Sequence, residues 1–201
     1  MPRDRAPSLR RICVFLGSSS GGRPEYAKAA REFARALVAR DFGLVYGGAS
    51  IGLMGILADT VLEAGGQVVG VIPESLDEKE VSHHGLSELR IVTSMHERKT
   101  VMSELSDAVI AMPGGLGTLE EFFEMLTWAQ LGFHSKPCGL LNPGGYFDRL
   151  LEFLDHAVSE RFLKPQHREL IISERDPGTL LDRLVSHRAR PTEKWIDREP
   201  G

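Results

Sequence analysis

Short apolar runs alternate with longer amphipathic stretches along this chain. The apolar runs are brief and are bounded by glycine, proline or polar residues, which is typical of buried strands. They lie at 12–16, 43–46, 67–72, 89–92, 107–112, 137–141 and 169–172, the last at a sheet edge. Between them, apolar residues recur at helical spacing in 24–40, 53–64, 95–105, 117–131, 147–158 and 176–187. Strands alternating with helices predict the α/β class, with a mostly parallel sheet covered on both faces.

We expect a single domain over residues 11–188, because no internal repeat and no linker divides the chain. Residues 1–10 are polar and rich in proline and arginine, which favours disorder, and 189–201 should form a flexible tail. An irregular polar segment contains the adjacent residues His83 and His84. Neighbouring side chains diverge on a helix and on a strand, so this pair does not favour a metal site.

Charge and composition narrow the class of partner. With 24 basic and 28 acidic residues among 201, the formal net charge is -4, which gives no electrostatic reason to bind nucleic acid or an anionic membrane. No apolar run is long enough to cross a bilayer, and the first residues lack the apolar region of a secretory signal. Cys13 and Cys138 lie in apolar runs without C-x-x-C spacing, as buried thiols in a reducing cytosol do. We therefore expect a soluble, cytoplasmic protein with a small-molecule ligand.

The strongest candidate for chemistry is the stretch 113–121, Pro-Gly-Gly-Leu-Gly-Thr-Leu-Glu-Glu, between a predicted strand and a predicted helix. Such a turn leaves backbone N–H groups aimed at one point, with the positive end of the helix dipole behind them. Its glycines let a phosphate approach the backbone, and Thr118 can cap the helix and offer its hydroxyl. Glu121 lies one turn into the helix. An anion cradle beside a carboxylate indicates a site that binds a phosphorylated compound and acts on it.

Two further glycine-rich turns strengthen this interpretation. A G-G-x-G turn alone can be only a tight connection, and its spacing matches neither the P-loop nor the dinucleotide-binding fingerprint. However, glycine-rich turns follow Leu16 and Tyr46 as well as Met112. All three turns lie at the carboxyl ends of predicted parallel strands, where the ligands of such sheets bind. Their convergence on one crevice predicts a nucleotide-type ligand.

The predicted helix 117–131 is apolar on two sides. One side carries Leu119, Phe122, Phe123, Leu126 and Gln130, and the other carries Met125, Trp128 and Ala129. A helix that only covers a sheet has one face in water. We therefore expect the outer side to be buried against a second subunit, which predicts a homodimer. The alternative is a helix buried deeply within one subunit.

A charged cluster, Met-His-Glu-Arg-Lys at 95–99, opens another predicted helix. Adjacent basic residues of this kind are commonly solvated and without function. At the start of a helix, however, the dipole disfavours positive charge, and this cost calls for a compensating anion. Beside a phosphate cradle, Arg98 would supply bidentate, charge-assisted contacts.

These motifs resemble the Lonely Guy (LOG) family. The likeness rests on P-G-G-x-G-T-x-x-E at 113–121 together with M-H-x-R-K at 95–99. It extends to G-S-S-S at 17–20, V-Y-G-G at 45–48, I-G-L-M-G at 51–55, T-W-A-Q-L-G at 127–132 and K-P at 136–137, and covers the chain from Ile12 to Leu184. One departure is Ala49, where many members have a third glycine. The departure bears on the ligand contact, because the Ala49 Cβ is expected near the crevice.

The resemblance implies a Rossmann-like, three-layer α/β/α homodimer that hydrolyses the N-glycosidic bond of cytokinin riboside 5'-monophosphates, and of AMP. The products would be a free base, such as an N6-prenylated adenine, and ribose 5-phosphate. Family members, long described in bacteria as possible lysine decarboxylases, need no metal and no organic cofactor. The implied catalytic pair is Arg98 and Glu121. The predicted substrate contacts are Gly17, Ser18, Ser19, Gly47, Gly48, Glu80, Met95, Arg98, Lys99, Gly114, Gly115, Leu116, Gly117, Thr118, Glu121 and Thr127.

The residues suit this chemistry independently. Glycosidic cleavage passes through an oxocarbenium-like sugar, which a nearby carboxylate stabilises. Near a helix start Glu121 is favoured as the anion, so it fits a nucleophile or a water-activating base better than an acid. Glu120 is expected to face elsewhere. Arg98 can anchor the phosphate or stabilise the departing purine, and the sequence leaves both roles open.

Three other functions fit parts of this pattern. A lysine decarboxylase would need a lysine for pyridoxal phosphate, and Lys99 is the only lysine near a motif. A nucleotide or molybdenum-cofactor carrier of the same fold would leave its ligand intact, which the pairing of Arg98 with Glu121 argues against. A general purine nucleoside-monophosphate nucleosidase would use the same residues, because the choice of base depends on the pocket around N6.

Overall fold

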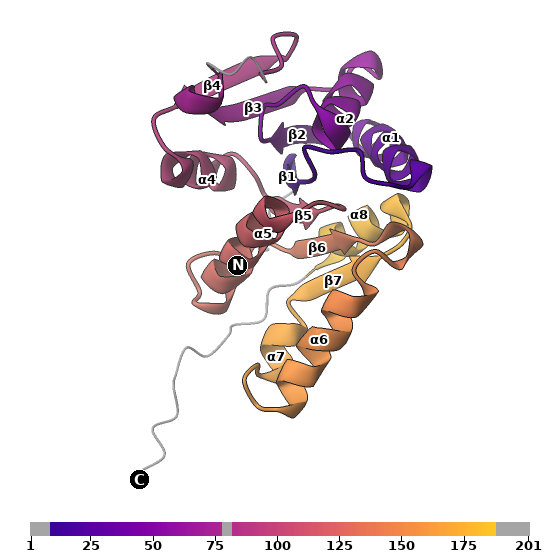
Figure 1. The fold of residues 1–201 in the computed structure, drawn as a ribbon, viewed down its shortest axis with the longest axis vertical. Helices are drawn as coiled ribbons and strands as arrows, with labels where there is room; N and C mark the ends of the chain where they lie inside the picture. Colours follow the sequence, from indigo (N-terminus) through magenta and orange to yellow (C-terminus); the bar gives the residue numbers. More distant parts are fainter. Residues whose placement is uncertain (1–8, 78–81, 188–201) are drawn as a thin grey trace, which may run out of the picture.

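The computed structural model describes residues 9–77 and 82–187. Within them the strands form one seven-stranded sheet in which every neighbouring pair is parallel (Figure 1). The strands are β1 (Arg11–Phe15), β2 (Gly43–Tyr46), β3 (Val68–Pro73), β4 (Glu88–Val92), β5 (Ala108–Ala111), β6 (Cys138–Leu141) and β7 (Ile171–Glu174). Their order is β4-β3-β2-β1-β5-β6-β7, so the direction of winding reverses between β1 and β5. Such a reversal is the point at which open α/β sheets bind ligands.

Helices cover both faces of the sheet and complete three layers (Figure 1). They are α1 (Pro24–Val38), α2 (Gly52–Glu63), α3 (Glu74–Asp77), α4 (Met95–Glu104), α5 (Leu116–Gln130), the 3-10 turn η1 (Pro143–Gly145), α6 (Asp148–Ser159), α7 (Pro165–Arg168) and α8 (Pro177–Ser186). On one face α1, α2 and α8 pack on strand residues that include Ile12 and Val14. On the other face α4, α5 and α6 pack on residues that include Cys13 and Phe15. Because successive strand residues point to opposite faces, a continuous apolar run makes both faces of the sheet apolar, and both are buried by helices.

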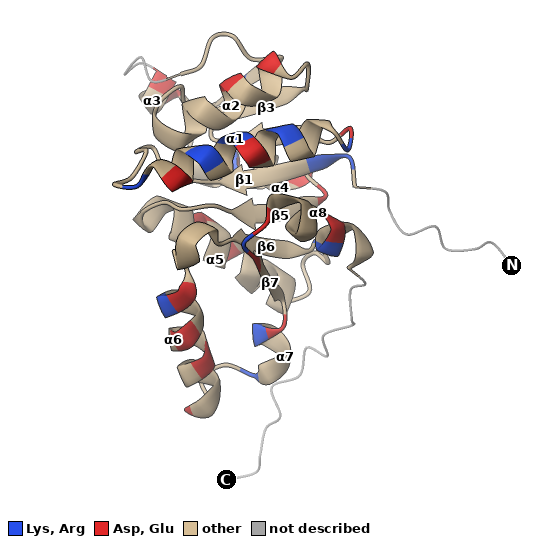
Figure 2. Cartoon of the chain, turned by 90° about the vertical axis from the view of Figure 1, so that its right-hand side faces the viewer, with Lys and Arg blue, Asp and Glu red and all other residues tan. Residues whose placement is uncertain are grey.

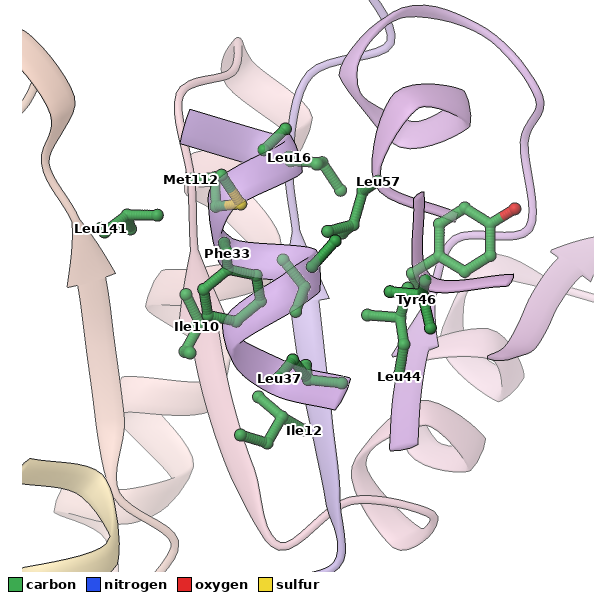
Figure 3. Packing of buried hydrophobic residues seen from close by; sticks show 14 of the residues in the cluster. Ile12, Leu16, Phe33, Leu37, Leu44, Tyr46, Leu57, Ile110, Met112 and Leu141 are labelled. Atoms are coloured by element: carbon green, nitrogen blue, oxygen red, sulfur yellow. The ribbon is translucent and has the colours of Figure 1, made fainter. Parts of the chain in front are cut away.

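The core beneath α1 and α2 fixes two of the glycine-rich turns. Phe33 and Leu37 of α1 and Leu57 of α2 lie over the strands, in contact with a cluster that includes Ile12 and Ile110 (Figure 3). All five side chains are fully buried, and burial of each contributes about 1.5–3 kcal/mol to stability. Charged residues of both signs follow the outer surface of α1 (Figure 2). The apolar side of each helix therefore determines where its preceding turn is held.

The predicted α/β architecture is confirmed. Each predicted strand and helix is present with its ends within two residues of the predicted ones, and the sheet is wholly rather than mostly parallel. The short elements α3, η1 and α7 were not predicted, because three or four residues are too few to show a period. The last strand begins at Ile171 instead of residue 169, because the turn after α7 continues through Leu170.

Some predictions lie at or beyond the limits of the described chain. The segments predicted to be disordered, 1–10 and 189–201, lie outside the described residues except for Leu9 and Arg10. Glu80, a predicted substrate contact, also lies outside them. Among the helices that the structure describes, none is both long and apolar enough to span a membrane.

Candidate active site

Three glycine-rich turns meet at the carboxyl ends of β1, β2 and β5, as predicted. The Gly17 N–H donates to the Pro113 carbonyl over 3.0 Å, which joins the turn after β1 to the turn after β5. The Leu53 N–H donates to the Gly17 carbonyl over 3.1 Å, which ties the start of α2 to the same turn. Gly47, directly after β2, accepts a hydrogen bond of 3.4 Å from Arg98 Nη2. The three turns are therefore held around one place at the reversal point of the sheet.

Two positions in these turns have no room for a side chain. A Cβ at Gly47 would overlap Arg98 Nη2, and a Cβ at Gly114 would overlap Thr118 Oγ1. The Cβ at Gly114 would also lie 2.8 Å from the Gly17 nitrogen. Glycine at both positions lets these neighbouring groups approach the backbone closely.

The third turn ends in the N-terminus of α5, which is open to an anion. Gly115 is the N-cap residue, and the Leu119 N–H donates to its carbonyl over 3.2 Å. The N–H groups of Leu116, Gly117 and Thr118 precede this bond and have no partner within the helix. Gly115, Leu116 and Gly117 are exposed. Free N–H groups and the helix dipole together favour a bound phosphate.

Thr118 does not cap α5, contrary to the sequence prediction. The helix begins at Leu116, so Thr118 is its third residue, and the N-cap position is taken by Gly115, which has no side chain to accept a bond. The Thr118 side chain is buried against Gly114. Within the described residues its hydroxyl makes no hydrogen bond, so it is able to donate one to a bound anion.

Arg98 lies near the start of α4, where reciprocal capping bonds fix the helix. The Ser94 hydroxyl accepts from the Glu97 N–H over 3.1 Å, and Glu97 Oε2 accepts from the Thr93 N–H over 2.8 Å. This arrangement is a variant of the capping box. Arg98 Nε in turn donates to the carbonyl of Val71, in the second half of β3, over 3.1 Å. The guanidinium group is therefore anchored to the sheet from a fixed helix.

Arg98 and Glu121, the predicted catalytic pair, face each other. Arg98 Nη1 lies 3.5 Å from Glu121 Oε1, and each side chain is 10% exposed. Burial raises the pKa of the Glu121 carboxyl, and the positive charge of Arg98 counteracts part of this increase. Glu121 thus supplies a negative charge to Arg98 from within the chain, and the phosphate contact expected for Arg98 stays a prediction. The two side chains form an ion pair that is longer than a good hydrogen bond, so a ligand atom can compete for either partner.

Glu120 faces away from Glu121, as predicted, and binds Lys99. The Lys99 Nζ lies 2.7 Å from Glu120 Oε1 and 2.8 Å from Glu124 Oε2. Two carboxylates of α5 therefore already hold the ammonium group. The substrate contact expected for Lys99 stays a prediction.

Three further predicted contacts lie at the edges of the site. Ser18 and Ser19 are exposed in the turn after β1, and the Ser19 hydroxyl accepts from the Gly21 N–H over 3.3 Å. Met95 is the first residue of α4, and its Sδ lies 3.6 Å from Arg98 Nη1. These side chains surround the Arg98 end of the site and the first turn.

The remaining predicted contacts differ in position. Gly48 is buried, and its φ of 78° is in the left-handed region that favours glycine. Thr127 lies six residues beyond Glu121, about 9 Å farther along the axis of α5. Its hydroxyl donates to the Phe123 carbonyl over 2.8 Å. The structure therefore brings Gly48 into the turn region and does not bring Thr127 close to Glu121.

Tyr146 belongs to the site and was not predicted. Its hydroxyl donates to the Gly114 carbonyl over 2.6 Å, and its ring makes T-shaped contacts with Tyr26 and Phe147. The sequence contained a signal, because Asn-Pro-Gly-Gly directly follows β6, the neighbour of β5 in the sheet. This is a fourth glycine-containing turn at the carboxyl end of a strand, and Tyr146 directly follows it.

The described residues offer little to a metal ion or to thiol chemistry. No group of three His, Cys, Asp or Glu side chains within the described residues is placed to hold a metal. His83 instead pairs with Asp59 at 2.8 Å. Cys13 and Cys138 are free and buried, and burial raises the pKa of Cys138 to about 12. A thiol with so high a pKa is a poor nucleophile at neutral pH.

Comparisons with known proteins identify relatives along most of the chain. A family model described as "Possible lysine decarboxylase" matches residues 54–184. The probable cytokinin riboside 5'-monophosphate phosphoribohydrolase LOGL9 of Oryza sativa subsp. japonica is 54% identical over 179 residues, which cover 89% of this chain and 79% of that protein. The cytokinin riboside 5'-monophosphate phosphoribohydrolase LOG5 of Arabidopsis thaliana is 49% identical over 180 residues, which cover 90% and 79%.

Solved structures share the fold at much lower identity. The molybdenum cofactor carrier protein of Chlamydomonas reinhardtii has a TM-score of 0.67 and 21% identity, covering 89% of this chain and 99% of that one. The molybdenum cofactor binding protein of Rippkaea orientalis has a TM-score of 0.66 and 20% identity, covering 88% and 96%. Such identities show a common Rossmann-like fold alone. The family-model match and the 54% and 49% identities show that the chain belongs to the LOG family.

Proposed function

We propose that the protein hydrolyses the N-glycosidic bond of cytokinin riboside 5'-monophosphates, and of AMP. Water adds to the anomeric carbon of the sugar, the bond to the purine breaks, and the products are ribose 5-phosphate and the free base. The observation that carries this proposal is the buried pair of Arg98 and Glu121 beside the glycine-rich N-terminus of α5. Relatives with 49% and 54% identity that are named for this reaction support it.

The 5'-phosphate is expected at the N-terminus of α5. The N–H groups of Leu116, Gly117 and Thr118, which have no partner within the helix, and the Thr118 hydroxyl all lie there, and the helix dipole adds a positive potential. Glu121 begins the second turn of the same helix. A nucleotide bound by its phosphate would therefore have its ribose close to the Glu121 carboxylate.

Glu121 acts on the sugar. Its ionised carboxylate stabilises the oxocarbenium-like transition state, as nucleophile or as the base that takes a proton from the attacking water. Because burial raises the pKa of Glu121, its carboxylate is a stronger base than an exposed one. The positive charge of Arg98 counteracts part of this increase and so favours the ionised carboxylate, which both roles require.

Arg98 stabilises the departing purine. Its guanidinium lies 3.5 Å from the Glu121 carboxylate, so a sugar carbon held against Glu121 is also close to Arg98. The phosphate lies farther along the nucleotide and is bound by the α5 N-terminus. Arg98 is also anchored to the carbonyls of Val71 and Gly47, which leaves its remaining N–H groups in a fixed direction. As negative charge develops on the leaving purine, the purine can accept hydrogen bonds from these N–H groups.

The contacts of Lys99 do not favour a lysine decarboxylase. A lysine that forms a Schiff base must become neutral and reach the aldehyde of pyridoxal phosphate. The two carboxylates raise the pKa of Lys99 above its ordinary value despite burial of its side chain, and they hold its Nζ. Absorbance of the purified protein in the visible range near that of pyridoxal phosphate would contradict this conclusion.

We also propose that the protein is a homodimer. Leu116, Leu119 and Phe123 follow each other at helical spacing along α5. Leu116 is 87% exposed, and the other two are only partly buried within one subunit. A second subunit would remove this apolar surface from water. Multi-angle light scattering should give twice the chain mass of 22.2 kDa, and a mass of one chain would contradict the proposal.

A cytoplasmic location and a small-molecule substrate complete the proposal. The two free, buried cysteines fit a reducing compartment. The net charge of -4 gives no attraction for nucleic acid or for an anionic membrane. Cell fractionation with detection of the protein tests the location.

The function is tested by incubation with isopentenyladenosine 5'-monophosphate and with AMP, followed by chromatography of the free base. Glu121→Gln serves as the catalytic control, and Glu32→Gln on the exposed side of α1 serves as the matched control. A clearly higher kcat/KM for the prenylated nucleotide would establish a cytokinin-producing enzyme. Similar values for both would establish a general purine nucleoside-monophosphate nucleosidase. Binding without any release of base would refute hydrolysis and favour a carrier.

A further inference from the structure

Lys99 occupies the space between α4 and α5. Its Nζ donates a hydrogen bond of 2.7 Å to Glu120 Oε1, and it forms an ion pair of 2.8 Å with Glu124 Oε2. The Lys99 side chain is 7% exposed, whereas that of Glu120 is 55% exposed. Glu120 and Glu124 are four residues apart and therefore share one face of α5. One ammonium group of α4 thus contacts α5 at two points.

The charges of this cluster are unfavourable for binding a phosphate. One ammonium and two carboxylates leave one negative charge in excess, and a phosphate placed against Lys99 Nζ would also approach Glu120 and Glu124. Burial lowers the pKa of Lys99, but the two carboxylates together raise it above its ordinary value. The ammonium therefore stays charged and directed towards α5.

The Lys99 cluster lies directly beside the catalytic pair in sequence. Arg98 precedes Lys99 on α4, and Glu121 follows Glu120 on α5. Adjacent residues of a helix point about 100° apart, so Arg98 and Lys99 contact different partners. Arg98 binds the Val71 carbonyl of the sheet, and Lys99 binds α5. The start of α4 is therefore held on two sides.

We propose that Lys99 is a positioning residue whose contacts with Glu120 and Glu124 hold α4 against α5 and so set the separation of Arg98 and Glu121. The inference rests on the proposed function, because it concerns the geometry of the hydrolytic pair. Lys99 acts through that pair. The expected effect on kcat is large, because a misplacement of catalytic groups by about 1 Å can lower the rate about 100-fold.

A contact between Lys99 and the substrate phosphate would have different consequences. In the double variant Glu120→Gln/Glu124→Gln, a phosphate-binding Lys99 would be released from its partners, so phosphate binding would tighten and kcat would hold or rise. A positioning Lys99 would lose its hold on α5 in the same variant, so kcat would fall. The two roles are therefore separated by the sign of the change in kcat.

The experiment compares the wild type with Lys99→Met, Lys99→Arg and Glu120→Gln/Glu124→Gln. Steady-state kinetics with isopentenyladenosine 5'-monophosphate give kcat and KM, and calorimetry gives the Kd for ribose 5-phosphate. We expect kcat to fall about 10- to 100-fold in Lys99→Met and in the double variant. The Kd should stay within about 3-fold, because the lost charges lie outside the phosphate cradle and are partly screened. Lys99→Arg keeps a positive charge within reach of both carboxylates and should recover part of kcat.

Two results would overturn the positioning role. One is an unchanged kcat in the double variant, and the other is a Lys99→Met protein whose only defect is a Kd raised by about 10-fold or more. If Lys99→Met does not fold, the double variant decides alone. The pair Lys28→Met/Glu32→Gln removes an exposed ion pair of 3.7 Å on α1 and should leave kcat unchanged. No turnover by the wild type would refute the proposed function instead, and the Kd values would still show whether Lys99 contacts the phosphate.

Discussion

Arg98 Nη1 lies 3.5 Å from Glu121 Oε1, although the two residues belong to helices that follow different strands. Arg98 is on α4, which connects β4 at the sheet edge with β5 beside β1. Helix α4 therefore crosses one face of the sheet, and its start is anchored to Val71 in the second half of β3. Glu121 approaches from α5, directly after β5. The pair exists because the sheet brings these two helix starts together.

Glu121→Gln should retain nucleotide binding and lose turnover. The amide fills the same space beside Arg98 but can neither attack the sugar nor accept a proton from water. Loss of a general base or nucleophile costs about 10²–10⁴-fold in kcat, while the phosphate cradle of α5 is untouched. Release of free base, measured by chromatography, and nucleotide affinity, measured by calorimetry, check both parts. Unimpaired turnover would remove Glu121 from the mechanism.

The pH dependence of the reaction should reflect the raised pKa of Glu121. Activity requires the ionised carboxylate, so kcat/KM should fall as the pH drops through a pKa above the ordinary glutamate value of about 4.3. The pKa of Glu121 is higher in the folded protein than in the unfolded chain. Stability is therefore lost as the pH rises from the unfolded pKa through the folded pKa. In urea unfolding, Glu121→Gln should therefore gain stability relative to the wild type as the pH rises through that window. A difference that does not change with pH would contradict the shift.

Much of the fold and part of the site could be predicted because they depend on local patterns. Continuous apolar runs mark strands buried on both faces, and glycine-rich turns mark their carboxyl ends. The rule that these ends meet was sufficient to predict that the three turns converge beside Glu121. The structure places Arg98 opposite Glu121, as an ion pair of 3.5 Å.

Contacts between elements could not be predicted in the same way. The hydrogen bond from Tyr146 to Gly114 and the contacts of Lys99 with α5 depend on which side chains reach across a gap, and spacing along one element does not contain this information. The capping role of Thr118 failed for a smaller reason. A capping Thr118 would need the helix to begin at Leu119, but it begins at Leu116, which places Thr118 inside the first turn.

Gly114→Ala should damage the phosphate cradle and lower stability. The added Cβ would overlap Thr118 Oγ1 and lie 2.8 Å from the Gly17 nitrogen, so two of the three turns must move. Overpacking of this kind costs about 1–3 kcal/mol, and misplacement of the cradle can cost up to about 100-fold in kcat/KM. Gly22→Ala is the matched control, because its Cβ would meet no described atom within 4 Å. Thermal unfolding and kinetics of both variants test the prediction, and equal behaviour would contradict it.

Tyr146→Phe should weaken phosphate binding while leaving the ring packing intact. The Tyr146 hydroxyl donates to the Gly114 carbonyl over 2.6 Å, and the peptide bond between Gly114 and Gly115 is trans. In a trans peptide the N–H points opposite to the carbonyl, so this bond also fixes the direction of the Gly115 N–H at the cap of α5. Phenylalanine keeps the T-shaped contacts at 5.5 and 4.9 Å, and loss of the hydrogen bond should cost about 0.5–1.5 kcal/mol of stability. We expect the KM for the nucleotide and the inhibition constant of inorganic phosphate to rise together, by about 3- to 10-fold. A larger KM with an unchanged phosphate inhibition constant would show instead that Tyr146 contacts another part of the nucleotide, because only the phosphate depends on this cradle.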